Sequence, residues 1–317
     1  MAEREFTLIV AVDGSDQACK AAERAGELAE LLQAPLHLLY VMPPRPAELG
    51  DVPANRTQDT DADLAAQRKA ASEALAAARR SLPPGVRDEA SPDVLEDIAH
   101  HGDPVRVIVE QGDNTPNAMV VMGARGQGGL KKLLLGSISD AVVHRAHFPV
   151  VIVHSEEHPA NHPGLRQVLL PVDGSESSDA AARMAGQVAR AAGATVHILF
   201  ASPKPPAELT AAGKTGGGAA RETASMAQSE TALAQRKAHN AFQRAREHLG
   251  RVEGDVIEHQ LHGRDPASAI LDYAQAQTEP GVLVIGRRSM GRLREFLTGS
   301  VSHSVINQVC CPVIVVS

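Results

Sequence analysis

An internal repeat constrains the fold of this 317-residue chain more than any other feature. L-I-V-A-V-D-G-S at 8–15 recurs as L-L-P-V-D-G-S at 169–175, and V-V-M-G-A-R-G at 120–126 recurs as L-V-I-G-R-R-S at 283–289. Four further matches follow the same order: P-L-H-L-L-Y-V with A-T-V-H-I-L-F-A, H-G-D-P with H-G-R-D-P, L-L-L-G-S with F-L-T-G-S, and F-P-V-V-I-V with C-P-V-I-V-V. The offset drifts only from 160 to 163 residues. Ordered matches at a nearly constant offset indicate tandem duplication of one domain.

The segment E-E-H-P-A-N-H-P-G-L at 156–165 separates the two copies. Its proline and polar content is typical of a linker. We therefore expect one domain over 1–155 and a second over 166–317, each close to the ordinary size of about 150 residues.

Within the first copy, short apolar runs alternate with Ala-rich stretches. Strands are expected at 6–12, 35–41, 94–99, 118–123 and 149–153, helices near 16–33, 62–81, 104–112 and 138–146, and loops at 43–60 and 202–230. This alternation predicts an α/β fold, with a doubly wound parallel sheet and right-handed crossovers in each of two tandem domains. The apolar residues are mostly aliphatic, with five Phe, two Tyr and no Trp, which suits a parallel sheet covered by helices.

Composition excludes several classes of partner. A net charge of −7 gives no footprint for nucleic acid, and aromatic residues are too scarce for a base-stacking platform. No apolar run approaches the ~20 residues of a membrane span. Three cysteines cannot form a disulfide framework, and acids stand where a signal peptide needs bases, so we expect a cytosolic protein with core thiols.

The stretch G-A-R-G-Q-G-G-L-K-K-L-L-L-G-S at 123–137 follows an apolar run that is typical of a buried strand. Ligands bind beyond the carboxyl ends of parallel strands, where such a loop lies. Glycines permit positive φ and expose backbone N–H groups, while Gly136 and Ser137 open a helix whose N-terminus favours an anion. The stretch therefore predicts a phosphate site; the alternative is a flexible connection closed by an ordinary Ser N-cap.

Asp13 ends the first strand and should face the same crevice, where its carboxylate can accept hydrogen bonds from a ribose or a base. The alternative is a turn aspartate in V-D-G-S, with Ser15 capping the next helix. Its recurrence as Asp173 does not separate the two, because duplication copies turns as well as sites.

The pattern G-x-x-G-x(9)-G-S at 123–137 resembles the nucleotide-binding signature of the universal stress protein family, in its ATP-binding branch. V-D-G-S, H-G-D-P and F-P-V-V-I-V are also similar to that family, so the resemblance covers both copies. It implies a five-stranded parallel sheet in the order 3-2-1-4-5, of the Rossmann-like adenine nucleotide alpha hydrolase type. ATP, or another adenine nucleotide, would lie between the first and fourth strands.

The resemblance also implies site residues in each copy. In the first copy they are Ala11, Val12, Asp13, Val41 and Met122 near adenosine, with Gly123, Arg125, Gly126, Gly136, Ser137 and Ile138 near the phosphates. In the second copy they are Pro171, Asp173, Gly286, Ser289, Gly299, Ser300 and Val301. Mg²⁺ would bridge the phosphates, and no metal cage of protein side chains is expected.

The second copy departs from the signature at Ser289, which replaces the second glycine. If that glycine needs positive φ or a bare backbone, serine costs on the order of 1 kcal/mol or more, or about tenfold in affinity. Neighbouring arginines provide an alternative phosphate contact or a simple charged surface: Arg287, Arg288, Arg292 and Arg294. We expect binding in copy 1 and weaker or altered binding in copy 2.

Other signals are set aside. A-G-K-T at 212–215 lacks the first glycine of a P-loop, since Glu208 stands there. The spaced histidines His154, His158 and His162, and the pair His259 and His262, are interpreted as surface residues rather than zinc ligands. Asp103 is expected to cap a helix, and Ser139, Ser302 and Ser304 to lie on helix faces.

The pattern favours a binding module without catalytic residues, whose nucleotide occupancy alters conformation or partners. The alternatives are a slow ATPase or autophosphorylating protein, for which no general base or arginine finger is evident, and a scaffold that binds no nucleotide. The last strands at 149–153 and 312–316 are expected to pair inside one chain, as such domains often pair between chains, which leaves a homodimer possible.

Overall fold

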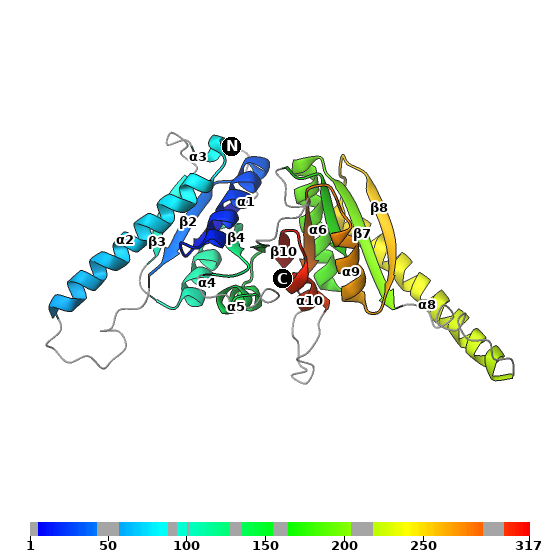
Figure 1. Cartoon of the computed structure of the whole chain (residues 1–317). Helices are drawn as coiled ribbons and strands as arrows, with labels where there is room; N and C mark the ends of the chain where they lie inside the picture. Colours follow the sequence, from blue (N-terminus) through cyan, green and yellow to red (C-terminus); the bar gives the residue numbers. More distant parts are fainter. Residues whose placement is uncertain are drawn as a thin grey trace. The chain divides into compact units, whose positions relative to one another are not determined.

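The computed structural model describes residues 6–42, 57–87, 94–99, 102–126, 135–154, 164–203, 218–287 and 301–317 (Figure 1). By their internal contacts, residues fall into two compact units. Unit 1 comprises Met1–Glu157, Pro312–Val315 and Ser317, and unit 2 comprises His158–Cys311 and Val316. The division falls inside the segment expected to be a linker.

Unit 1 contains a parallel sheet. Its strands are β1 (Thr7–Val12), β2 (Leu36–Val41), β3 (Val94–Ala99), β4 (Ala118–Gly123) and β5 (Val150–Val153). They lie in the order β3-β2-β1-β4-β5, and every pair among these five is parallel. Val313–Val315 of β10 (Val313–Val316) continue the sheet of unit 1, where β10 runs antiparallel to β5 with Val313 opposite Ile152. The predicted strand order is confirmed for this unit.

The helices of unit 1 are α1 (Asp16–Leu32), α2 (Thr57–Ser81), α3 (Pro84–Arg87), α4 (Pro104–Asn114) and α5 (Ser137–Arg145). α1 packs with α2 against the sheet, and α4 packs with α5 (Figure 1). α1 buries alanines at helical spacing, including Ala18, Ala22, Ala25 and Ala29. Such small side chains let the helix approach the aliphatic strands closely.

Unit 2 repeats this arrangement. Its strands are β6 (Gln167–Pro171), β7 (Thr195–Pro203), β8 (Val256–Gly263) and β9 (Gly281–Gly286), parallel and in the order β9-β6-β7-β8. Its helices are α6 (Glu176–Ala192), α8 (Gly218–Leu249), α9 (Pro266–Gln275) and α10 (Val301–Gln308). α6 packs with α8, while α9 lies against β7 and β8 and contacts α10 (Figure 1).

The strands and helices expected for the first copy are confirmed to within two residues, with two exceptions. α2 begins at Thr57, inside the expected loop 43–60, and the short helix α3 was not predicted. The sequence T-Q-D-T-D-A-D from Thr57 contains acids, a residue type that favours a helix N-terminus, and this signal was not used in the expected boundary.

The expected loop at 202–230 is wrong at both ends. β7 continues to Pro203, and α8 begins at Gly218. The sequence A-A-R-E-T-A-S-M-A-Q-S-E after Gly218 is rich in strong helix formers, a signal outweighed in the sequence by the glycines before it. A-G-K-T at 212–215 lies outside the described residues.

Two further predictions concern the whole chain. Among the described residues, no helix is both long enough and apolar enough to cross a membrane. Cys310 and Cys311 are buried, and burial raises the pKa of the Cys311 thiol, as expected for core residues; Cys19 is only half-buried.

Candidate functional site

A cavity of about 460 Å³ lies in unit 1 at the carboxyl ends of β1, β2 and β4. The residues that line it come from three strand ends and from the starts of α1, α4 and α5: Ala11, Val12, Asp13, Ala18, Leu39, Tyr40, Val41, Pro104, Ile108, Met122, Gly123, Arg125, Gly126, Gly136, Ser137, Ile138 and Ser139. Every residue proposed for the first copy is among them. The structure therefore brings the proposed residues together; what they bind stays a prediction.

Asp13 serves both in the turn and in the cavity. Its Oδ1 accepts hydrogen bonds from the N–H of Ser15 at 2.9 Å and from the Ser15 hydroxyl at 2.6 Å. Ser15 Oγ in turn accepts from the N–H of Ala18 at 3.1 Å and caps α1, while Gly14 has φ +82°. The turn interpretation is thus correct for one carboxylate oxygen, and the turn holds the side chain of Asp13 in the cavity wall.

Gly126 is required by space and not by backbone conformation. A Cβ placed on Gly126 would lie 2.3 Å from Asp13 Oδ2, which is far inside contact distance. None of Gly123, Gly126 and Gly136 has φ in the left-handed region. Of the two alternatives considered for the second glycine, positive φ is therefore wrong, and the need for a backbone without a side chain holds at Gly126. The second glycine of the pattern leaves room for a carboxylate that is 113 positions earlier in the chain.

Both ends of the loop after β4 are held by backbone hydrogen bonds. The N–H of Ala124 donates to the carbonyl of Val153 at 2.8 Å, and the N–H of Gly136 donates to the carbonyl of Ala124 at 2.7 Å. The N–H of Arg125 donates to Gln17 Oε1 at 3.1 Å. The loop therefore leaves and returns at one point beside β4. Gly128, Gly129, Lys131 and Lys132 lie outside the described residues.

The first turn of α5 borders the cavity. Gly136 is the N-cap of α5, Ser137 is its first residue, and no side chain forms a cap hydrogen bond. The alternative of an ordinary Ser N-cap is therefore wrong for this helix. An N-terminal turn without a side-chain cap offers its N–H groups to an anion. Ile138 is 40% exposed, unusual for a large apolar side chain and consistent with a place beside a ligand.

Sequence reasoning missed the role of Ser139. It lies on a helix face as expected, but it is 4% exposed, and its hydroxyl donates to the carbonyl of Gly123 at 2.9 Å. This bond ties the start of α5 to the end of β4, so the two parts of the glycine pattern keep their spacing. The one available signal was the recurrence of the serine as Ser302.

The apolar wall of the cavity was also missed in part. Leu39 and Tyr40 precede the predicted Val41 on β2, while Pro104 and Ile108 lie one turn apart on α4. Pro104 belongs to the repeated H-G-D-P, which was a usable signal. The expected capping role of the residue before it is confirmed, because the Asp103 side chain accepts from the N–H of Arg106 at 2.9 Å.

Charge is sparse around the cavity. Among the described residues that line it, Asp13 carries the only carboxylate and Arg125 the only guanidinium. Backbone N–H groups, a hydroxyl and a guanidinium suit phosphate oxygens. One carboxylate is too few for an all-protein Mg²⁺ cage, but it fits a Mg²⁺ ion that takes most of its ligands from phosphates and water.

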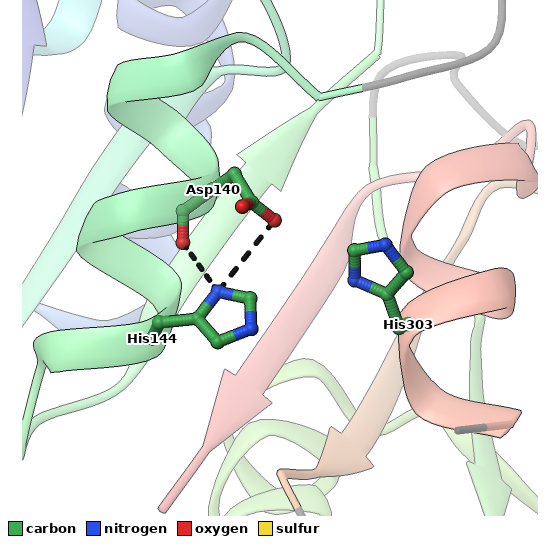
Figure 2. Close-up of side chains that lie close together, drawn as sticks. All are labelled: Asp140, His144 and His303. Carbon is green, nitrogen blue, oxygen red and sulfur yellow. Dashed lines mark hydrogen bonds and ion pairs between the residues drawn. The ribbon is translucent and has the colours of Figure 1, made fainter. Parts of the chain in front are cut away.

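A histidine on α5 lies outside this wall. His144 Nδ1 is 2.7 Å from the carbonyl oxygen of Asp140, one turn earlier, and 3.6 Å from Asp140 Oδ1 (Figure 2). A carbonyl only accepts, so Nδ1 donates, and the ring is held against its own helix. Neither residue lines the cavity.

Unit 2 repeats the frame of the site. Asp173 Oδ1 accepts from the N–H of Ser175 at 3.0 Å and from its hydroxyl at 2.5 Å, and the Ser302 hydroxyl donates to the carbonyl of Gly286 at 3.0 Å. The N–H of Arg287 donates to the carbonyl of Val316 at 2.7 Å. The equivalent bond in unit 1 runs from the N–H of Ala124 to the carbonyl of Val153. Burial lowers the pKa of Arg287.

The remaining residues proposed for the second copy are divided. Pro171 ends β6, and Val301 begins α10. Ser289, Gly299 and Ser300 lie outside the described residues, as do Arg288, Arg292 and Arg294. The described residues of unit 2 therefore include the strand ends and the helix starts around the site, whereas its loop residues lie outside them.

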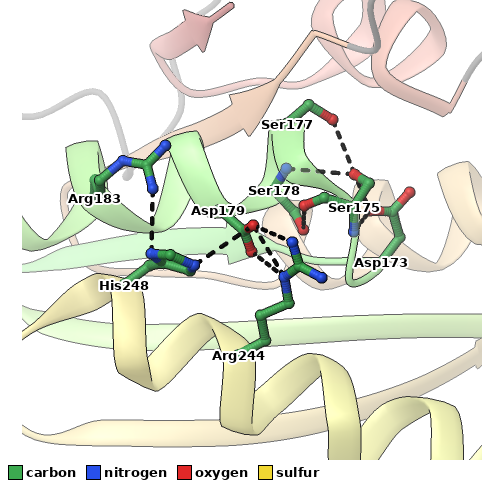
Figure 3. A network of polar contacts seen from close by, with 8 residues as sticks. All are labelled: Asp173, Ser175, Ser177, Ser178, Asp179, Arg183, Arg244 and His248. Carbon is green, nitrogen blue, oxygen red and sulfur yellow. Dashed lines mark hydrogen bonds and ion pairs between the residues drawn. The ribbon is translucent and has the colours of Figure 1, made fainter.

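A polar network distinguishes unit 2 from unit 1. Asp179, 5% exposed, accepts three hydrogen bonds from Arg244 at 2.6–2.9 Å, and His248 Nε2 lies 3.5 Å from the same carboxylate (Figure 3). Arg183 contacts the other nitrogen of His248 at 3.2 Å. The network joins α6 to α8. By the offset of 160, the corresponding position in unit 1 is Cys19, which cannot form it.

Comparisons with known proteins agree with this architecture. The model of the universal stress protein family matches residues 6–154 and 164–317. A universal stress protein of Mycobacterium tuberculosis is 30% identical over 97% of this chain and 95% of its own length, and one of Mycolicibacterium smegmatis is 28% identical over 98% and 97%. The crystal structure of a universal stress protein from Archaeoglobus fulgidus matches with a TM-score of 0.63 at 21% identity, covering 99% of each chain, and so supports the fold. With two family matches that span nearly all of it, this chain belongs to the universal stress protein family as a tandem, two-domain member.

Proposed function

We propose that unit 1 binds an adenine nucleotide, with ATP as the ligand, and that this protein is a cytosolic, nucleotide-responsive binding module. The observation that carries the proposal is the convergence, in one cavity, of Asp13 with both held ends of the glycine loop and the first turn of α5. The cavity volume of about 460 Å³ lies within the ~300–1,000 Å³ that small-molecule sites occupy.

The two sides of the cavity suit the two parts of a nucleotide. Leu39, Val41, Met122 and Ile108 provide an apolar wall for the base, with the carboxylate of Asp13 as an acceptor for ribose hydroxyls. On the other side, Gly123, Gly126 and Gly136 line the phosphate end of the cavity. There the first turn of α5 offers N–H groups, Ser137 offers a hydroxyl, and Arg125 adds positive charge. When bound, Mg²⁺ would neutralise phosphate charge.

For unit 2 we propose weaker or altered binding. The support comes from Gly126: beside Asp13 there is no room for a Cβ, and the corresponding residue of unit 2 is Ser289. If the frame around Asp173 has the same spacing as that around Asp13, serine at this position displaces either the carboxylate or the loop.

We propose binding rather than catalysis because the described lining contains one carboxylate and no histidine. Phosphoryl transfer needs a group that positions or deprotonates the nucleophile, together with cations around the transferred phosphate. Any turnover should therefore be slow. Partner proteins and a homodimer remain predictions, to be tested by light scattering with and without nucleotide.

The first experiment is denaturation of the freshly purified full chain, followed by mass spectrometry of the released small molecules. We expect an adenine nucleotide; its absence, together with no binding of added ATP, would support the nucleotide-free scaffold instead. Titration with ATP, ADP and AMP should reveal one tight site per chain, and two equal tight sites would refute the asymmetry.

A matched pair of variants locates the site. Asp13→Ala should weaken ATP binding at the tight site by about 10- to 150-fold, whereas Asp173→Ala, the same change in the other copy, should leave that affinity unchanged. Steady-state phosphate release is measured on the same samples. Rapid release that Asp13→Ala abolishes would show an enzyme and overturn the proposal of a binding module.

A further inference from the structure

Three side chains with metal-binding atoms meet on one face of the sheet of unit 2, and none of them lines the cavity of unit 1. His197 Nδ1, on β7, lies 3.1 Å from His259 Nε2, on β8. Tyr273 Oη, on α9, lies 2.9 Å from the first nitrogen and 3.0 Å from the second. The three atoms form a nearly equilateral triangle, although the residues are up to 76 positions apart in the sequence.

The packing of α9 creates this triangle. In the register of β7 and β8, Leu199 lies opposite His259, so His197 and His259 project from the same face of neighbouring strands. The imidazole rings stack with centroids 5.2 Å apart and an interplanar angle of 17°. α9 lies against both strands and brings the Tyr273 ring to 4.9 Å from that of His259.

Hydrogen bonds alone satisfy this triangle poorly. A neutral imidazole nitrogen offers either one N–H or one lone pair, and the phenol offers a single proton. Two well-directed hydrogen bonds therefore fit the three atoms, and the third close contact has no proton of its own. A cation at the centre would instead accept a lone pair from all three.

The three distances between these atoms are close to the distances between ligands of a tetrahedrally coordinated metal ion. Ligands at about 2.0–2.1 Å from Zn²⁺ lie roughly 3.3–3.4 Å apart, so the sides of the triangle have to lengthen by only about 0.2–0.5 Å. We propose that His197, His259 and Tyr273 bind a divalent transition-metal ion, with two imidazoles and a phenolate as ligands. The fourth position is open to water or an exogenous ligand, because all three residues are only half-buried.

The surroundings suit a cation. Burial lowers the pKa of both histidines, so protons compete little for their nitrogens at neutral pH, and the carboxylate of Glu279 favours positive charge at His197. Burial raises the pKa of the Tyr273 phenol, so binding of the ion has to drive its deprotonation. In that step the O–H bond breaks, the metal–oxygen bond forms, and the proton passes to the buffer.

The trio belongs to unit 2 alone. The corresponding positions of unit 1, by offset and by register, are His37, Asp97 and Gln111, so duplication of the domain does not account for it. It also revises the expectation of no metal site. His259 and His262 were considered together, but residues three apart on a strand face opposite sides, and His262 contacts Ser202 at 3.1 Å instead.

The test uses the full chain, stripped of metal, in buffer without nucleotide or phosphate, titrated calorimetrically with Zn²⁺. We expect one site per chain that is tighter than the remaining sites. His259→Ala and Tyr273→Phe should each weaken it by about tenfold or more, and Tyr273→Phe should remove the released proton. His262→Ala, on the same strand but the other face, is the matched control and should leave the affinity unchanged within about twofold.

Co²⁺ provides a second measurement, since its visible absorption reports tetrahedral coordination and should be lost in the same two variants. If His259→Ala does not fold, Tyr273→Phe decides alone, because it keeps the ring and removes only the hydroxyl. The proposal is refuted if Tyr273→Phe binds Zn²⁺ like the parent chain and releases as many protons. It is equally refuted if His262→Ala weakens the site as much as His259→Ala does.

Discussion

Substitution of Gly126 by alanine tests the geometry of the nucleotide site most directly. The added Cβ would lie 2.3 Å from Asp13 Oδ2, whereas real Cβ atoms essentially never come closer than 3.0 Å to another heavy atom. The carboxylate must therefore retreat by at least about 0.7 Å, which requires rotation of the Asp13 side chain away from its preferred position.

The size of the effect follows from what the carboxylate loses. An off-rotamer side chain costs ~0.5–1.5 kcal/mol, and weakening of one hydrogen bond from Ser15 costs a further ~0.5–1.5 kcal/mol. Because a bound nucleotide needs the carboxylate in its original place, this total of ~1–3 kcal/mol opposes binding and corresponds to an affinity loss of about 5- to 150-fold. Gly126→Ser, which copies Ser289 of unit 2, should lose at least as much.

Calorimetric titration with ATP measures the loss, and a double-mutant cycle identifies its cause. In an Asp13→Ala background the clash is absent, so Gly126→Ala should change the affinity by less than about threefold. Gly136→Ala is the matched control for the effect of a glycine-to-alanine change on thermal stability, because its Cβ would meet no atom closer than 3.4 Å. The reasoning fails if Gly126→Ala binds ATP like the parent chain, or if its effect persists undiminished without the carboxylate.

Three other predictions concern stability. Ser139→Ala removes the hydrogen bond to the end of β4 and should lower the free energy of unfolding by about 1 kcal/mol, with weaker ATP binding; unchanged values in urea unfolding and titration would contradict this. Gly112→Ala would place a Cβ 2.2 Å from the Phe148 ring and should destabilise by ~1–3 kcal/mol in the same assay. Burial, and for His197 also the neighbouring His259, lowers both imidazole pKa values, so the unfolded chain binds more protons below about pH 6.5. Stability should therefore fall as pH drops through that value, and His259→Gln should reduce the fall.

The sequence predicted most of the fold because the relevant signals are local or repeated. Alternating aliphatic and Ala-rich runs set the strands and helices, and the constant offset set the two domains. The errors came from competing local signals, as at Gly218, where a run of glycines precedes residues that favour a helix.

The candidate site was predictable to a similar degree. Parallel strands place their carboxyl ends at one edge of the sheet, so Asp13 and Gly123 lie close together once β1 and β4 are neighbours. The reason for Gly126 was predictable only in part. The sequence allowed either positive φ or a need for a bare backbone, and the structure shows the second, with the Asp13 carboxylate in the space that a side chain would fill. The positions of Tyr40 and Ser139 also depended on packing.

The sequence by itself thus determined the duplication, the order of elements and the residues that reach the edge of the first sheet, since periodicity and chain direction are properties of short segments. Tertiary structure alone decided which side chains touch. Asp13 with Gly126, Ser139 with Gly123, and His197 with Tyr273 are each brought together by strand register and helix packing. Such contacts join residues far apart in the chain, where no local pattern records the distance between them.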